Sequence, residues 1–207
     1  MTGKIIDRLT VAGTGLIGGS FALALKKAGA VSHITGIDSD PRNLEKALAL
    51  GIIDSASHSI EEGVSDAQAV FVAVPVRSIS AVVSSIAPFI PEGCIVTDGG
   101  SVKADVVNEC ESILGGGMPF VGGHPIAGTE HSGAAAAFAT LFENRRCILT
   151  PTSRTDDSAL LTVKYLWESV GSRVEMMDPE SHDRVLAAGS HLPNMVGYTL
   201  VYAVARL

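Results

Sequence analysis

The chain has 207 residues, of which 46% are hydrophobic and 18% charged, and its formal net charge is −7. This composition is typical of a folded α/β protein, and the length allows one large or two small domains with a substantial core. The negative charge and the lack of a basic block argue against nucleic acid or an anionic membrane surface as a partner.

The three cysteines, Cys94, Cys110 and Cys147, are widely spaced and form no CxxC pair. They are predicted to be buried thiols in a reducing compartment, with no disulfide framework and no metal site. Residues 1–7 lack the apolar core of a signal peptide, and the apolar run 69–76 is far shorter than the ~20 residues of a membrane helix. We therefore expect a cytoplasmic protein.

A glycine-rich turn near the N-terminus is the strongest local signal. Apolar residues lead directly into Gly13-x-Gly15-x-x-Gly18, and a helical pattern follows at once. Gly13 permits a sharp turn, Gly15 lets a pyrophosphate approach the backbone, and Gly18 lets the helix pack closely on the strand. Free N–H groups at the start of the helix would then face the phosphates, so the motif predicts a dinucleotide site.

A second apolar run, residues 33–37, ends in Asp38, close to the ~20-residue spacing at which a carboxylate binds the adenosine ribose. A carboxylate there repels a 2′-phosphate, and Ser39 and Asp40 offer no cation, so NAD is favoured over NADP; Arg42 would soften the repulsion. The predicted cofactor-binding residues are Gly13, Gly15, Leu16, Ile17, Gly18, Asp38, Ser39, Val74 and Pro75.

Helix and strand patterns alternate along the rest of the chain. Helices are predicted over 41–50, 78–89, 102–114 and 160–170, and strands over 52–53, 69–74, 94–97, 120–122, 147–150 and 172–177. Ser101 is placed to cap the helix that starts at residue 102. The alternation predicts an α/β, Rossmann-type fold with a doubly wound, mostly parallel sheet.

A helical region is expected after the sheet. Pro179 begins a helix that continues to about Gly189, and Pro193 predicts a break. Residues 195–207 are apolar on nearly all sides, which requires burial. We expect residues 1–178 to form the dinucleotide-binding domain and residues 179–207 to be the start of an all-helical substrate and dimerisation domain, within which the chain ends.

Polar residues that follow strands are the candidates for chemistry, because open α/β sheets bind ligands beyond the carboxyl ends of their strands. They are Asp38, the turn 98–101, and His124 within residues 122–130. A histidine at a strand exit is a candidate general base, since its ordinary pKa is ~6.5; the alternative is a solvated loop histidine. Ser101 is a helix cap, or a catalytic hydroxyl if His124 lies within hydrogen-bond reach.

Four segments, in this order, resemble the prephenate dehydrogenase family of tyrosine biosynthesis, also called arogenate or cyclohexadienyl dehydrogenases. They are Gly13-Thr-Gly-Leu-Ile-Gly-Gly-Ser20, Asp98-Gly-Gly-Ser-Val-Lys103, Gly123-His-Pro-Ile-Ala-Gly-Thr-Glu130 and Ser190-His-Leu-Pro193. The resemblance implies oxidation of a cyclohexadienyl alcohol by NAD(P) with loss of CO2, from prephenate to 4-hydroxyphenylpyruvate or from arogenate to tyrosine. It also implies a homodimer built from the helical domain, and no metal.

The resemblance also assigns roles to residues. His124 accepts the proton of the ring 4-hydroxyl while hydride leaves the same carbon, and Ser101 hydrogen-bonds the histidine and the substrate. Substrate contacts are implied for Ser101, His124, Thr129, Glu130, Asp183, Ser190 and Asn194. Asn194 stands where many members have a second histidine, and it cannot become cationic. The arginine that holds the substrate carboxylate falls beyond Leu207, and His182 and His191 are interpreted as structural.

Two other functions remain compatible with the nucleotide domain. A β-hydroxy-acid dehydrogenase would rely on a helix-borne lysine, and no lysine follows Lys164 in this chain. A non-catalytic dinucleotide-binding regulatory module would hold His124 far from the nicotinamide ring.

Overall fold

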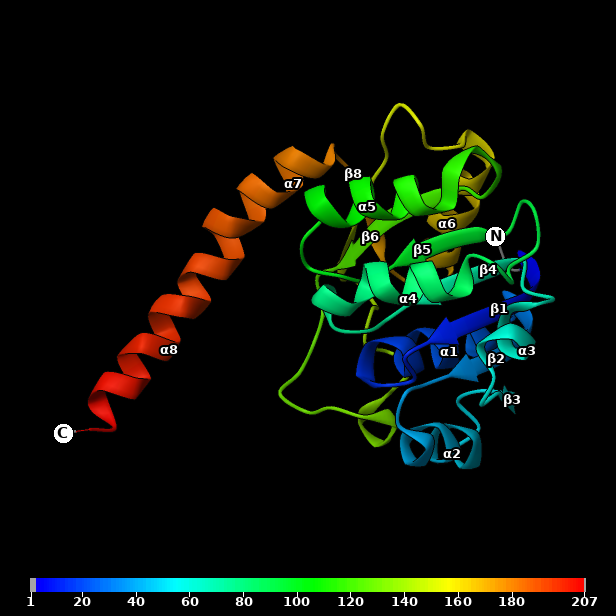
Figure 1. The fold of residues 1–207 in the computed structure, drawn as a ribbon. Helices are drawn as coiled ribbons and strands as arrows, with labels where there is room; N and C mark the ends of the chain where they lie inside the picture. Colours follow the sequence, from blue (N-terminus) through cyan, green and yellow to red (C-terminus); the bar gives the residue numbers. More distant parts are fainter. Residues whose placement is uncertain (1–2, 207) are drawn as a thin grey trace.

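A computed structural model describes residues 3–206 of the chain, and within this range eight strands form one sheet in the order β3-β2-β1-β4-β5-β6-β7-β8 (Figure 1). The strands are β1 (Ile6–Ala12), β2 (Val31–Ile37), β3 (Ser55–Ala56), β4 (Ala69–Val72), β5 (Ile95–Asp98), β6 (Phe120–Pro125), β7 (Arg146–Thr150) and β8 (Arg173–Met176). Neighbouring strands are parallel except for β6 and β7. The predicted doubly wound, mostly parallel sheet is confirmed.

Helices cover both faces of this sheet. They are α1 (Leu16–Ala28), α2 (Pro41–Ala49), α3 (Ile60–Val64), α4 (Ile79–Ile86), α5 (Ala104–Leu114) and α6 (Asp157–Ser169). Apolar side chains of α1 and α6 pack in one buried cluster around Phe21, Phe71 and Trp167. Those of α4 and α5 pack in a second cluster that contains Val83 and Val107. The two clusters hold the carboxyl ends of the central strands in place, and these ends carry the candidate site.

Three local predictions are wrong. The third strand lies at Ser55–Ala56, because the N–H of Ile52 donates to the carbonyl of Ala47 at the end of α2 and the chain joins the sheet only after Ile53. Strand β6 does not stop before His124 but continues to Pro125, where it pairs with β7. The predicted cap by Ser101 is absent in this part of the described chain, since α5 begins at Ala104 and its first N–H groups donate to the carboxylate of Asp183.

The helical region is continuous where a break was predicted. Helix α7 (Pro179–Leu186) runs into a π-helical turn (Ala187–His191), which leads into α8 (Leu192–Val204). In this turn the N–H of Leu192 donates to the carbonyl of Ala187, five residues earlier. Pro193 therefore falls in the first turn of α8, where a missing N–H group is tolerated. Pro193 starts a helix and does not end one.

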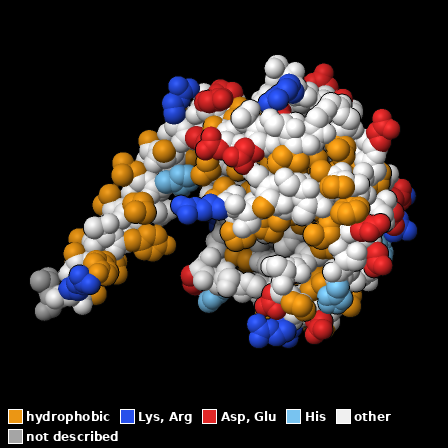
Figure 2. Space-filling view, in the orientation of Figure 1, with side chains coloured by type: hydrophobic (Ala, Val, Ile, Leu, Met, Phe, Trp, Pro, Cys, Tyr) orange, Lys and Arg blue, Asp and Glu red, His pale blue; other side chains and the backbone are white. Residues whose placement is uncertain are grey.

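Helix α8 extends away from the α/β body, as Figure 1 shows. None of its residues, 192–204, is buried, and side chains such as Leu200 and Tyr198 are 63% and 75% exposed. In Figure 2 hydrophobic side chains lie along this projecting segment. None of the helices in residues 3–206 has the length and apolar character needed to cross a membrane.

Candidate active site

The glycine-rich turn has the geometry that an anion site requires. Gly13 adopts a φ of +93°, and a Cβ at this position would lie 2.6 Å from the carbonyl oxygen of Ala73. A Cβ at Gly18 would overlap the carbonyl oxygen of Gly13, so only glycine permits this close approach of helix and strand. Gly15 begins α1 without a side-chain cap and faces open space. The start of α1 can therefore accommodate a phosphate.

A cavity of about 540 Å³ lies beside this turn. Five of the predicted cofactor residues line it, namely Gly13, Asp38, Ser39, Val74 and Pro75. The other four, Gly15, Leu16, Ile17 and Gly18, belong to the turn and the first residues of α1 and do not line this cavity. The donor set suits a dinucleotide: a helix N-terminus for the phosphates and a carboxylate for ribose hydroxyls.

The side chain of Asp38 is fixed by neighbours that the sequence patterns did not identify. One carboxylate oxygen accepts hydrogen bonds from the N–H and hydroxyl of Thr14, at 2.8 and 2.9 Å, and from the amide of Asn43, at 2.7 Å. The other accepts one bond, from the N–H of Asp40 at 2.9 Å. That second oxygen retains acceptor capacity for a ribose hydroxyl.

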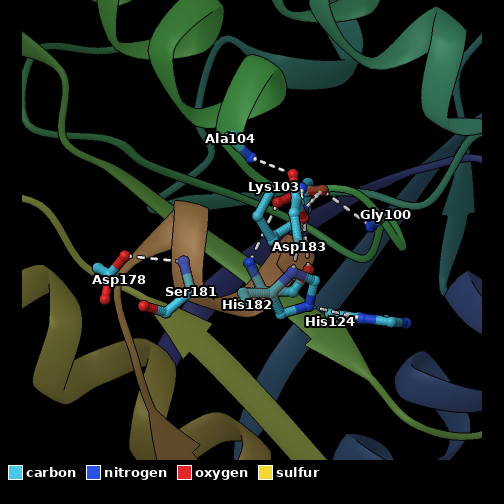
Figure 3. Close-up of polar contacts among 10 residues, drawn as sticks. Gly100, Lys103, Ala104, His124, Asp178, Ser181, His182 and Asp183 are labelled. Atoms are coloured by element: carbon cyan, nitrogen blue, oxygen red, sulfur yellow. Dashed lines mark hydrogen bonds and ion pairs between the residues drawn. The ribbon is translucent and has the colours of Figure 1, made fainter. Parts of the chain in front are cut away.

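His124 lies at one end of a buried hydrogen-bond chain (Figure 3). Its Nδ1 is 2.9 Å from Nε2 of His182, and Nδ1 of His182 is 2.8 Å from Oδ1 of Asp183. His182 is fully buried. The Asp183 carboxylate also accepts the N–H groups of Lys103 and Ala104, at 2.8 and 2.9 Å, which anchors α7 to the start of α5. His182 and Asp183, three and four positions after Pro179, were the available sequence signal, but the prediction made His182 structural and Asp183 a substrate contact.

The environment of His124 keeps its imidazole neutral. Burial, together with the charges of His182, Lys103 and His191, lowers the pKa of His124 to about 3, and Asp183 only partly opposes this. Burial likewise lowers the pKa of His182. Burial tends to raise the pKa of Asp183, but hydrogen bonds from Ala104, His182 and Lys103 lower it overall. At neutral pH His124 therefore carries a free lone pair.

An ion pair between Lys103 and Asp98 lies beneath the site, and both side chains are fully buried. Lys103 also donates to the carbonyl of Gly123 at 3.1 Å, and Asp98 accepts the N–H groups of Gly100 and Gly123, at 2.8 and 3.1 Å. The pair thus joins the turn after β5 to the residue before His124. No role had been assigned to Lys103 from sequence.

A second cavity, of about 630 Å³, contains most of the predicted substrate residues. Ser101, His124, Thr129, Ser190 and Asn194 line it. Arg145 also lines it and is the single Lys or Arg among the described lining residues. The cavity is therefore bounded by β6, by the loop after it, and by the π-helical turn and α8.

Two predicted substrate residues do not line this cavity, and one predicted contact is absent. The side chain of Glu130 is 84% exposed and pairs with His131, while Asp183 caps α5. Within residues 3–206, His124 forms its side-chain hydrogen bond with His182 and none with Ser101. Ser101 lines the cavity beside His124, and its catalytic role stays a prediction.

The fold and the two cavities define a Rossmann-type nucleotide-binding protein with a neutral histidine at the carboxyl edge of its sheet. The profile of the family "Prephenate dehydrogenase, nucleotide-binding domain" matches residues 21–176. The chain therefore belongs to the prephenate dehydrogenase family.

Individual relatives agree with this assignment. The chain is 41% identical over 197 residues to a prephenate dehydrogenase of Bacillus subtilis, covering 95% of this chain and 53% of the relative. It is 35% identical to a cyclohexadienyl dehydrogenase of Zymomonas mobilis, covering 97% and 68%. The structure of Aquifex aeolicus prephenate dehydrogenase in complex with hydroxyphenyl propionate and NAD+ superposes with a TM-score of 0.91 at 42% identity, covering 97% and 70%. The chain spans about half the length of the B. subtilis relative.

Proposed function

We propose that this chain provides the nucleotide site and the catalytic base of an NAD-dependent dehydrogenase that oxidatively decarboxylates prephenate or arogenate. The observation that carries the proposal is the position of neutral His124 in the wall of a cavity shared with Ser101, Thr129, Ser190 and Asn194. The Aquifex aeolicus relative binds NAD+ and an aromatic acid, which agrees with the two cavities of this chain.

The chemistry follows from the neutral imidazole. His124 takes the proton of the 4-hydroxyl group, and the oxygen electrons form a carbonyl as hydride leaves the same carbon. Bound NAD+ supplies the hydride acceptor. The bond to the ring carboxylate then breaks, CO2 departs, and its electron pair completes the aromatic ring. The phenolic oxygen recovers the proton from His124, so the base is regenerated. Arg145 contributes a positive charge to the cavity, and Glu143, which also lines it, is paired with Lys27 at 3.1 Å.

Turnover of both substrates by the full-length protein tests the proposal. Reduction of NAD+ would be followed by absorbance with prephenate and with arogenate, and CO2 release would be measured in parallel. Nucleotide binding without turnover would instead support a regulatory module. Oxidation of a β-hydroxy acid, with no oxidation of prephenate or arogenate, would support a β-hydroxy-acid dehydrogenase.

The full-length protein is expected to prefer NAD+ over NADP+ by about tenfold or more in kcat/KM, which corresponds to ~1.4 kcal/mol. Asp38 lies in the nucleotide cavity, where its carboxylate accepts ribose hydroxyls and repels a 2′-phosphate. Asp38→Asn should lower the ratio of kcat/KM for NAD+ to kcat/KM for NADP+. Asp156→Asn is the matched control, because Asp156 caps α6 without lining the nucleotide cavity and asparagine caps helices equally well. Equal kcat/KM values for the two cofactors in the unaltered protein would contradict the assignment.

We further propose a domain boundary near residue 178, with residues 179–207 belonging to a substrate and dimerisation domain. Asp178 caps α7, helix α8 projects from the body, and Ser190 and Asn194 line the cavity. We also propose a cytoplasmic location, because the three cysteines are buried free thiols.

The full-length protein should sediment as a homodimer at micromolar concentration. Exposed apolar side chains of α8 are stabilised by burial against another apolar surface, and α8 of a second copy provides one. Leu200→Glu should weaken this association. Leu161→Glu is the matched control, since Leu161 is also an exposed helical leucine but lies on α6. A monomeric unaltered protein, or equal effects of both substitutions, would refute the assignment.

A further inference from the structure

We propose that His182 and Asp183 are positioning residues that fix the tautomer of His124, so that Nδ1 carries the hydrogen and Nε2 offers the lone pair. The tautomer follows from the hydrogen bonds of this chain alone. Its use in catalysis rests on the proposed function, in which His124 is the base.

The direction of the hydrogen-bond chain is set at Asp183. A carboxylate can only accept, and here it already receives the backbone N–H groups of Lys103 and Ala104. Its third contact, with Nδ1 of His182 at 2.8 Å, is favourable only if that nitrogen bears a hydrogen. The opposite arrangement would place the nitrogen lone pair of the fully buried His182 against a carboxylate oxygen, which is repulsive.

The protonation of His182 in turn determines which nitrogen of His124 donates. Burial lowers the pKa of His182 and favours its neutral form, which has one hydrogen. Since that hydrogen is on Nδ1, its Nε2 is an acceptor, and the partner atom 2.9 Å away must donate. That partner is Nδ1 of His124, so the remaining nitrogen of His124, Nε2, is the free acceptor.

The arrangement also stabilises the charge that forms during turnover. When Nε2 of His124 takes a proton, the positive imidazolium is linked through His182 to the negative carboxylate of Asp183. The fully buried Lys103–Asp98 pair nearby is neutral overall. Asp183 is therefore the uncompensated negative charge in the hydrogen-bonded set of Figure 3 that faces the histidines.

Asp183→Ala tests the inference, because it removes the acceptor that holds the hydrogen of His182 on Nδ1. Asparagine is unsuitable, since one oxygen of Asp183 accepts from both His182 and Lys103 and an amide oxygen in that position would preserve the tautomer. Without the carboxylate neither tautomer of His182 is selected, and His124 should populate both of its own tautomers. We expect kcat to fall by about 10- to 100-fold, with the Kd for NAD+ unchanged.

Nitrogen-15 NMR of histidine-labelled protein provides a readout that does not depend on activity. In the unaltered protein, Nε2 of His124 should resonate as an unprotonated nitrogen, with the signal assigned by its loss in His124→Asn. In Asp183→Ala both ring nitrogens of His124 should show the averaged shifts of mixed tautomers. Asp178→Ala is the control, because the side chain of Asp178 caps the same helix α7 through the N–H of Ser181 and contacts neither imidazole ring.

A hydrogen on Nε2 of His124 in the unaltered protein overturns the inference, whatever the result for Asp183→Ala. It is equally overturned if Asp183→Ala leaves both the tautomer and kcat unchanged. If the expected tautomers are found but neither prephenate nor arogenate is oxidised, the proposed function fails while the assignment of the hydrogen-bond chain stands.

Discussion

His124→Asn is expected to lower kcat by about 10²–10⁴-fold and to leave the Kd for NAD+ unchanged. Asparagine occupies a similar volume and forms hydrogen bonds, but it cannot take a proton near neutral pH. The nucleotide cavity is lined by other residues, so cofactor binding should persist. Steady-state kinetics with prephenate, combined with a cofactor titration, measures both quantities.

The pH profile adds a second test of the same base. In the proposed mechanism the unaltered full-length protein should lose activity on the acid side, where protonated His124 has no lone pair for the hydroxyl proton. Burial and the charges of His182, Lys103 and His191, partly opposed by Asp183, together lower the pKa of His124 to about 3. This loss of activity should therefore begin well below an ordinary histidine pKa of ~6.5. The rate should therefore change little between about pH 6 and 8.

The control for this prediction is His131→Asn. His131 is a neighbour in sequence whose side chain is 74% exposed, and it does not line the cavity. It should retain the full rate. Retention of more than about a tenth of kcat by His124→Asn, with the chemical step rate-limiting, would show that another group is the base.

Lys103→Met should lower the free energy of unfolding by about 3–5 kcal/mol. The substitution leaves the carboxylate of Asp98 fully buried without its cation, although the N–H groups of Gly100 and Gly123 still donate to it. An uncompensated buried charge is among the most destabilising single changes. In a domain of this size the loss corresponds to a fall in Tm of roughly 6–20 °C.

Urea denaturation measures this loss, with Lys26→Met as the matched control. Lys26 pairs with Asp54 at 2.6 Å, but both side chains are about 30% exposed, so its removal should cost at most ~1 kcal/mol. The double variant Lys103→Met with Asp98→Asn should recover part of the stability because it removes the unpaired buried carboxylate of Asp98. Equal losses for Lys103→Met and Lys26→Met would contradict the assigned role of the buried pair.

The sequence by itself determined the nucleotide turn, the sheet and the position of the candidate base. Gly13, Gly18, Asp38 and His124 are identifiable because each follows a strand pattern at a short, fixed spacing. Local chemistry specifies such features: a turn with positive φ needs glycine, and a buried parallel strand needs a continuous apolar run.

The contacts around the base were decided only by the tertiary structure. His182 meets His124 across 58 residues of sequence, and Asp183 caps a helix start 80 residues before it. No local pattern encodes such pairs, because they form only where the fold brings α5, α7 and β6 together. The position of Pro193 at the start of α8 was also decided by the tertiary structure. Whether a proline breaks a helix or begins one depends on the hydrogen bonds of the preceding turn, and here that turn is the π-helical turn at Ala187–His191.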